Sequence, residues 1–234
     1  MILNTKITKL LAAIAGISLI AGILAGVICI CSTGLSFYTK EYAKLGVAED
    51  IGISSDDLRN ATEILIDYTT GDREDMVAMA DFGGEIKEVF NDREKAHMVD
   101  VQKLFLGAKN LSWICVGAAA GLFILLFIFA KQKRDIFRGY TYSNYIFLAV
   151  FALIAVYAAV DFTSFWTSFH HVFFTNDLWL LDPATDNLIL MVPEQFFFDL
   201  VFRIVAWFVG IGGVLYLVSL YFGKKPLKGA KNVS

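Results

Sequence analysis

Three histidines, His97, His170 and His171, are the side chains of this chain best suited to moving protons near neutral pH. His97 follows Glu94 by three residues and precedes Asp100 by three, so one face of a helix would carry all three side chains. The two carboxylates would then either support the imidazole or act as solvated charges in the first turns of the helix. This spacing makes His97 a candidate acid or base, with Glu94 and Asp100 as candidate supporting groups.

His170 and His171 stand in a nearly uncharged run of aromatic residues. The run contains Phe162, Phe165, Trp166, Phe169, Phe173, Phe174 and Trp179. Surface histidines within an interfacial aromatic belt would be the plainer interpretation. The density of rings around two imidazoles instead favours an apolar pocket at the level of the lipid headgroups. The predicted pocket residues are Phe169, Phe173, Phe174, Trp179 and Trp166.

Composition places these residues in a membrane protein. The 234 residues are 57% hydrophobic and 18% charged, whereas a soluble domain carries about 25% charge. The net charge of -3 is too small and of the wrong sign for a nucleic-acid partner. Three cysteines, Cys29, Cys31 and Cys115, lie inside apolar runs and define neither a disulfide framework nor a zinc site.

Four stretches are long and apolar enough to cross a bilayer as helices. They cover residues 10–32, 111–130, 142–161 and 200–222. GxxxG motifs at Gly22–Gly26 and Gly117–Gly121 indicate close helix packing. The predicted organisation is a first span at 1–32, a cap at 33–110, two spans at 111–161 joined by a cytoplasmic loop at 131–141, an aromatic-rich outer loop at 162–199, and a fourth span with a basic tail at 200–234.

Basic residues cluster in three segments that flank the expected spans. They are Lys6 and Lys9; Lys131, Lys133, Arg134 and Arg138; and Lys224, Lys225, Lys228 and Lys231. Because cytoplasmic loops carry an excess of Lys and Arg, both termini are predicted to be cytoplasmic in the cell membrane. The cap and the loop at 162–199 then share the outer face.

The cap itself is expected to be helical. Ser54 precedes acidic residues typical of a first helical turn, and apolar residues follow at helical spacing until Gly71. Asn91 and Glu94 resemble a capping box that opens a second helix carrying His97 towards the second span. The predicted fold is therefore an all-α membrane protein with four transmembrane helices and a small helical extracytoplasmic cap.

Two ionisable groups are expected near the outer ends of the spans. Asp161 ends the third span about 20 residues from its cytoplasmic start, and Arg203 lies at a similar depth in the fourth. Because ionisable residues at such depth usually pair, an Asp199–Arg203 ion pair is the plainer expectation. Asp161 could orient a histidine or accept a hydrogen bond from Arg203.

Several kinds of chemistry lack their motifs. HExxH, paired CxxC, GxSxG and the glycine-rich phosphate loop are all absent from the sequence. A zinc site built from His97, Glu94 and either His170 or His171 is allowed by residue type alone. Neither a metal nor a cofactor is predicted.

Two segments together resemble a known protein family. They read NDREKAHMVDV at 91–101 and FHHVFFTNDLWLLDPATD at 169–186, with PEQFF at 193–197. They are similar to a family of bacterial integral membrane proteins that includes the lipoprotein intramolecular transacylase, Lit, of Gram-positive bacteria. The resemblance runs from the first expected span to the fourth.

This resemblance implies an acyltransferase whose substrate is a diacylglyceryl lipoprotein held among membrane lipids. The sn-2 acyl chain would move to the α-amine of the N-terminal cysteine of the same molecule, leaving a lyso-form lipoprotein. The resemblance also implies two catalytic histidines, namely His97 and the histidine of the F-H-x-x-F-F pattern, His170. His171 is the alternative partner if the helix is rotated by one residue.

Two imidazoles suit that reaction, because an amine must lose a proton and a glyceryl oxygen must gain one. The transition state is an eight-membered ring, so a crowded aromatic cleft would help by holding the substrate folded and excluding water. Our hypothesis makes His97 the base and His170 the acid or oxyanion stabiliser, with exchanged roles as its alternative. A metal-dependent membrane hydrolase and a non-enzymatic sensor or assembly protein are the competing interpretations.

Overall fold

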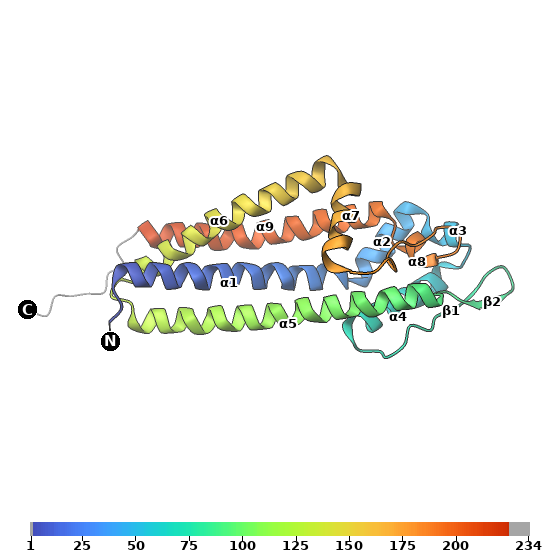
Figure 1. Cartoon of the computed structure of the whole chain (residues 1–234), viewed down its shortest axis with the longest axis horizontal. Coiled ribbons are helices and arrows are strands. Elements are labelled where there is room, and N and C mark those ends of the chain that lie inside the picture. The colour runs from blue at the N-terminus through green and yellow to red at the C-terminus, as the bar shows by residue number, and fades with distance from the viewer. Residues whose placement is uncertain (1, 225–234) are drawn as a thin grey trace, which may run out of the picture. The chain divides into compact units, whose positions relative to one another are not determined.

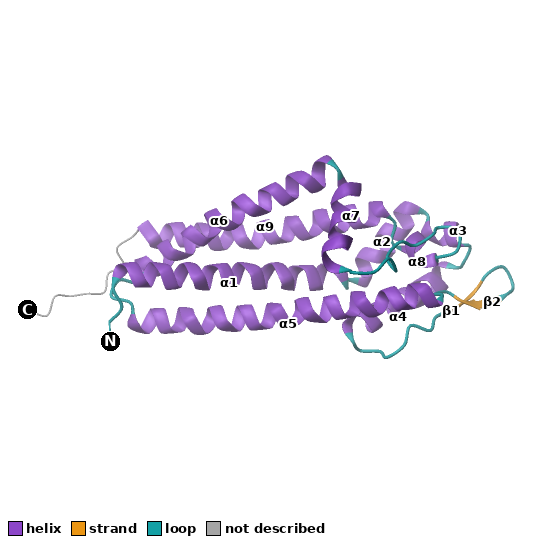
Figure 2. Ribbon diagram, in the orientation of Figure 1, coloured by secondary structure: helices purple, strands orange, loops and turns teal. Residues whose placement is uncertain are grey.

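The computed structural model describes residues 2–224 and consists almost entirely of helices (Figures 1 and 2). The elements in chain order are α1 (Thr5–Ser32), α2 (Leu35–Leu45), α3 (Val47–Ile51), α4 (Ser55–Thr70), β1 (Met79–Asp81), β2 (Ile86–Glu88), α5 (Asp92–Phe129), α6 (Arg134–Val160), α7 (Phe162–Phe173), α8 (Asn187–Met191) and α9 (Glu194–Lys224). Within the described residues, α1, α5, α6 and α9 are long and apolar enough to cross a membrane. The prediction of four membrane helices is confirmed, while the basic tail residues Lys225, Lys228 and Lys231 lie outside the described residues.

The chain forms two compact units. The first, here called the bundle unit, comprises Met1–Val27, Asn110–Ala159 and Val205–Ser234. The second, here called the histidine unit because it contains all three histidines, comprises Ile28–Lys109 and Val160–Ile204. Helices α1, α5 and α9 contribute residues to both units.

Close packing of α1 against α5 organises the bundle unit (Figure 1). A Cβ added at Gly22 would lie 2.9 Å from Cγ2 of Val116, so only glycine allows this approach. The Ser112 hydroxyl donates to the Gly22 carbonyl at 2.8 Å across the same contact. The Gly22–Gly26 motif therefore serves packing, as predicted, whereas a Cβ at Gly117 would meet nothing within 4 Å.

The segment 131–141, expected to be a loop, is helical over most of its length, because α6 already begins at Arg134. Asp135 stands in the first turn, where a carboxylate complements the helix dipole. Gly139 brings this turn against α1, since an added Cβ would lie 2.5 Å from the Lys9 carbonyl oxygen. Ile136 and Tyr140 are buried in consequence.

The expected cap helix is confirmed as α4. The Ser54 hydroxyl accepts a hydrogen bond from the Asp57 backbone N–H at 3.0 Å, and Gly71 ends the helix with φ 81°. The apolar residues at helical spacing form its buried face: Leu58, Ala61, Leu65 and Tyr68.

A β-hairpin interrupts the otherwise helical histidine unit and was not predicted (Figure 2). Strands β1 and β2 pair antiparallel, with Ala80 opposite Lys87. The connecting turn uses Gly83 and Gly84, both at positive φ. Each strand has three residues, which is too short for a clear alternation of polar and apolar positions.

The segment 162–199, expected to be a loop, contains two helices and the start of a third. Asp161 caps α7 by accepting from the Ser164 backbone N–H at 2.9 Å. Helix α8 follows. Pro193 stands directly before Glu194, the first residue of α9, and proline is favoured at the start of a helix. Phe162, Phe165, Trp166, Phe169 and Phe173 are therefore on α7, whereas Phe174 and Trp179 follow it in the connection to α8.

Candidate functional site

His97 and His170 lie together in the histidine unit, although 73 residues separate them in sequence. Their ring centroids are 6.4 Å apart, and each residue is only 8% exposed. Both line a cavity of about 360 Å³, here called the histidine cavity. His97 comes from the first turns of α5 and His170 from the last turn of α7.

Four of the five predicted aromatic residues, Trp166, Phe169, Phe174 and Trp179, make ring contacts with this histidine pair. Trp166 and Trp179 line the cavity, and the Phe174 ring lies 5.3 Å from the His97 ring in an edge contact. Phe169, Phe173 and Phe174 are not among the residues that line the cavity. Phe169 and Phe173 are one helical turn apart on α7, with ring centroids 4.8 Å apart, and Phe169 stacks on the lining residue Trp166 at 5.0 Å.

Other segments of the histidine unit complete the cavity wall. The remaining lining residues are Ser32, Thr33, Tyr38, Leu65, Ile66, Thr69, Met98, Val101, Phe105, Leu180, Leu181, Leu188, Ile189, Val192, Phe197 and Leu200. The sequence analysis did not find them, because local patterns identify a buried face without identifying what it faces. The apolar face of α4 was such a pattern, and Leu65 belongs to both that face and the cavity wall.

His170 is held firmly by its neighbours. Its Nδ1 lies 2.7 Å from the Trp166 backbone carbonyl oxygen, and the Trp179 ring stacks on it with centroids 4.6 Å apart and planes at 27°. Burial lowers the pKa of His170 below its usual value; the Trp166 hydrogen bond opposes this and nearby His171 adds to it. The ring is thereby kept neutral near pH 7.

His97, unlike His170, has a buried ring nitrogen without a hydrogen-bond partner among the described residues. Its Nδ1 is buried and finds no hydrogen-bond partner among the described residues. A buried N–H without an acceptor is costlier and rarer than an acceptor without a donor. The neutral ring is therefore best accommodated with its proton on Nε2.

Glu94, predicted to support His97, is instead committed to the backbone. It is fully buried and forms the predicted capping box with Asn91, accepting from its N–H at 2.6 Å while the Asn91 side chain accepts from the Glu94 N–H at 3.0 Å. The other carboxylate oxygen accepts from the Leu188 N–H. Glu94 thus ties the start of α5 to α8, and neither oxygen is free for the zinc site considered from sequence.

The arrangement of the other His, Cys, Asp and Glu side chains does not support that zinc site either. Across residues 2–224, no group of three or more His, Cys, Asp or Glu side chains is arranged to hold a metal ion. Asp100, the second predicted supporting carboxylate, accepts from Asn176 at 2.9 Å and from Lys103 at 3.2 Å. It therefore ties α5 to the segment after α7.

The remaining predicted site residues, Asp161, Arg203 and His171, do not line the histidine cavity. Asp161 caps α7 and neither orients a histidine nor bonds to Arg203. The expected Asp199–Arg203 pair is wrong: Asp199 pairs with Lys44, which local spacing could not reveal. Arg203 lies over the Phe37 ring at 4.9 Å from its centroid. His171 is exposed, and its ring makes a T-shaped contact with Trp179 at 5.2 Å.

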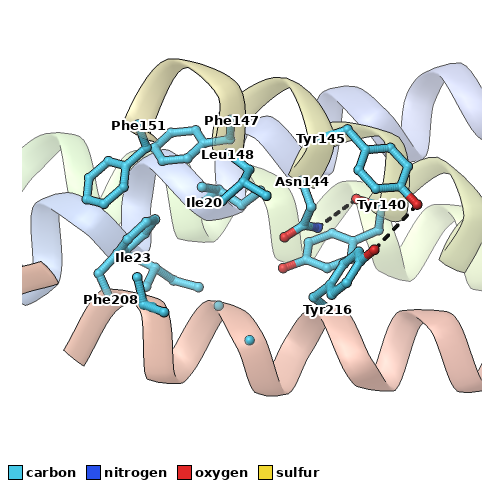
Figure 3. Close-up of a pocket in the computed structure, with 13 residues that line it drawn as sticks. Ile20, Ile23, Tyr140, Asn144, Tyr145, Phe147, Leu148, Phe151, Phe208 and Tyr216 are labelled. Carbon is cyan, nitrogen blue, oxygen red and sulfur yellow. Dashed lines mark hydrogen bonds between the residues drawn. The ribbon is translucent and has the colours of Figure 1, made fainter. Parts of the chain in front are cut away.

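A second cavity lies in the bundle unit, between α1, α6 and α9 (Figure 3). This tyrosine cavity has a volume of about 190 Å³ and a mostly apolar wall. Its lining residues are Ile20, Ile23, Tyr140, Asn144, Tyr145, Phe147, Leu148, Phe151, Phe208, Val209, Gly212, Gly213 and Tyr216. Tyr216 donates to the Tyr145 hydroxyl at 3.4 Å, and the Asn144 amide donates to the Tyr140 carbonyl at 2.9 Å.

The sequence of this chain matches the model of a known protein family. Residues 13–197, which include both buried histidines, match the family model of the lipoprotein intramolecular transacylase Lit. The chain belongs to the Lit family. Lit proteins are transferases by their family description, so the chain is an integral membrane acyltransferase of this family, as the sequence resemblance implied.

Solved structures of Lit share the fold. An in meso structure of Lit from Bacillus cereus matches with 21% identity over 94% of this chain and 97% of that chain, at a TM-score of 0.77. Structures of the same Lit carrying a histidine-to-arginine or a histidine-to-alanine substitution each match at 20% identity and a TM-score of 0.73. They cover 94% of this chain and 93% or 94% of theirs. A search of curated proteins found no match.

Proposed function

We propose that this protein transfers the sn-2 acyl chain of a diacylglyceryl lipoprotein to the α-amine of that molecule's N-terminal cysteine. The observation that carries the proposal is the pair of buried imidazoles, 6.4 Å apart, in the wall of one largely apolar cavity. Membership of the Lit family supplies the class of reaction. The product would be a lipoprotein with an N-acyl cysteine and one remaining glyceryl ester.

The chemistry needs a base of near-neutral pKa and a dry, confined space. The amine nitrogen forms a bond to the ester carbonyl carbon, and the electron pair of the carbonyl moves to its oxygen. The bond to the glyceryl oxygen then breaks, and this oxygen takes up the proton that the amine has lost. Because the amine and ester belong to one molecule, holding them together in an eight-membered ring is the main entropic obstacle.

The hydrogen bonds favour His170 as the base and His97 as the oxyanion stabiliser. This is the alternative with exchanged roles that the sequence left open. A carbonyl oxygen can only accept, so the 2.7 Å contact with Trp166 fixes the His170 proton on Nδ1. Its Nε2 then carries the lone pair that accepts the proton from the amine and returns it to the glyceryl oxygen. His97, with its proton on Nε2, donates a hydrogen bond to the developing oxyanion and stays neutral throughout.

The cavity wall suits a lipid-bearing substrate. Most lining side chains are aliphatic or aromatic, and the lining residue Trp166 stacks on Phe197 with centroids 4.1 Å apart. Such a wall excludes water that would otherwise hydrolyse the ester. A volume of about 360 Å³ accommodates the glyceryl-cysteine core and part of a chain, so the rest of each acyl chain would remain in the lipid.

We further propose that both termini are cytoplasmic and that the segments 33–110 and 162–199 lie outside the cytoplasmic membrane. The support is the clustering of basic residues in the first turns of α1, around the α5–α6 connection and, in the sequence, from Lys224 onwards. This orientation would place His97 and His170 on the face where mature lipoproteins display their N-terminal cysteine. Cysteine accessibility labelling at positions 60 and 132 would test it.

The function is tested by expressing the chain in a host whose lipoproteins are diacylated with a free N-terminus. Mass spectrometry of a purified lipoprotein should show an N-acyl, lyso-glyceryl cysteine with the wild-type chain and only the diacyl form with an empty vector. His97→Ala should yield little lyso-form. An unchanged diacyl lipoprotein beside well-expressed wild-type protein would refute the proposed function.

A further inference from the structure

Trp179 carries a hydrogen-bond donor that the described residues leave unused. Its indole Nε1 is buried and has no acceptor among residues 2–224, although Trp179 lines the histidine cavity. Indole nitrogen can only donate. A buried donor without an acceptor is destabilising, so this N–H calls for an acceptor supplied from the cavity.

The other polar groups of the cavity wall are already engaged. The hydroxyls of Ser32 and Thr33 donate to carbonyls one turn earlier in α1, at 2.7 and 2.9 Å. Tyr38 donates to the Ser32 carbonyl at 2.9 Å, and Thr69 to the Leu65 carbonyl at 2.7 Å. Nε2 of His170, the His97 imidazole and the Trp179 indole N–H are therefore the groups that a bound molecule could engage.

The position of the indole is fixed by its surroundings. Its ring stacks on His170 at 4.6 Å. The chain on either side is tied to α5, because Arg93 donates to the Leu180 carbonyl at 3.1 Å and Asn176 donates to Asp100 at 2.9 Å. A donor held in this way needs little reorganisation when charge develops beside it.

We propose that the Trp179 indole N–H donates a hydrogen bond to the carbonyl oxygen of the ester that is cleaved. This inference rests on the proposed function. As the amine attacks, the electron pair of the carbonyl moves to this oxygen, and Trp179 together with His97 would form its oxyanion hole. Trp179 exchanges no proton; it stabilises the negative charge until the glyceryl oxygen departs.

The first test compares Trp179→Phe with the wild type on a synthetic diacylglyceryl-cysteine lipopeptide, with lyso-form production followed by mass spectrometry. Phenylalanine keeps a ring that can stack on His170 but removes the donor. We expect kcat to fall on the order of 10²-fold with little change in KM, as for removal of one oxyanion donor. Trp113→Phe is the control, because Trp113 is 73% exposed and is not among the residues that line the cavity.

Two kinetic outcomes would overturn the proposal. An unchanged kcat would show that no donor is needed, and a raised KM with unchanged kcat would place the indole on the ester that is not cleaved. Failure of the wild type itself to make lyso-form would instead refute the proposed function.

A second test does not depend on turnover or on a folded variant. The wild-type protein is labelled with ¹⁵N at its tryptophan indoles and titrated with the same lipopeptide carrying an acetylated amine, which cannot react. The Trp179 indole proton should move downfield as the ester carbonyl accepts its hydrogen bond. Saturated binding without movement of that resonance would overturn the proposal.

Discussion

The tyrosine cavity of the bundle unit and the histidine cavity of the histidine unit have similarly apolar walls but different polar groups. In the tyrosine cavity, Tyr145 and Tyr216 bond to each other and Asn144 bonds to the backbone (Figure 3). A phenol ionises only near pH 10, whereas an imidazole changes charge near pH 7. The histidine cavity is therefore marked as the reactive one by titratable nitrogens with unused hydrogen-bonding capacity, which size or apolar lining would not reveal.

The sharpest test of this contrast replaces the proposed base. His170→Ala should lower kcat/KM about 10²–10⁴-fold, because the proton acceptor is lost. His171→Ala should change it little, since that ring is exposed and outside the cavity wall. Rates of lyso-form production from a synthetic lipopeptide measure both. The opposite pattern would identify His171 as the partner of His97.

The next test fills each cavity in turn. Val101→Phe adds bulk in the wall of the histidine cavity and should lower kcat/KM roughly tenfold or more by displacing substrate from its reactive geometry. Gly212→Leu adds bulk in the tyrosine cavity, where an added Cβ meets nothing within 4 Å. Its kcat/KM should match the wild type. Equal losses in both variants would mean that the tyrosine cavity also takes part in the reaction.

Replacing Glu94, which holds the start of α5 against α8, should reduce the stability of the fold. Glu94→Gln removes the charge and leaves one amide nitrogen facing a backbone N–H, so we expect a loss of about 2–3 kcal/mol in stability. Thermal unfolding in detergent measures it. Glu63→Gln, which breaks only an exposed pair with Arg59, should cost less than about 1 kcal/mol. Equal losses would contradict the structural role assigned to Glu94.

The smallest expected effect is in the pH profile. Because burial lowers the pKa of His170 below its usual 6.5, its neutral, proton-accepting form persists to more acidic pH. The substrate amine ionises near pH 7.7–8.0, so kcat/KM should fall with one slope below that pH and steepen only below pH 6.5. A steepening above pH 6.5 would show that His170 is not held neutral by burial.

Local patterns were enough to predict the four membrane helices, α4 and the start of α5, whereas the choice of His97 and His170 as a pair came from the family resemblance. The four apolar stretches, the Ser54 cap and the Asn91–Glu94 capping box each depend on residues close in sequence. The Lys44–Asp199 pair and the contact of Glu94 with Leu188 join segments far apart in the chain. Only the tertiary fold decides such partners, and for the same reason the cavity wall contributed by α4 was not predicted.

The stacking of Trp179 on His170 has an optical consequence. A protonated imidazole in contact with an indole quenches its fluorescence by accepting an electron from the excited ring, whereas a neutral imidazole does so far less. Emission from Trp179 should therefore dim as His170 gains a proton and brighten as it loses one. The cavity thus contains its own light-emitting reporter of the charge on its proposed base, readable without substrate or added dye.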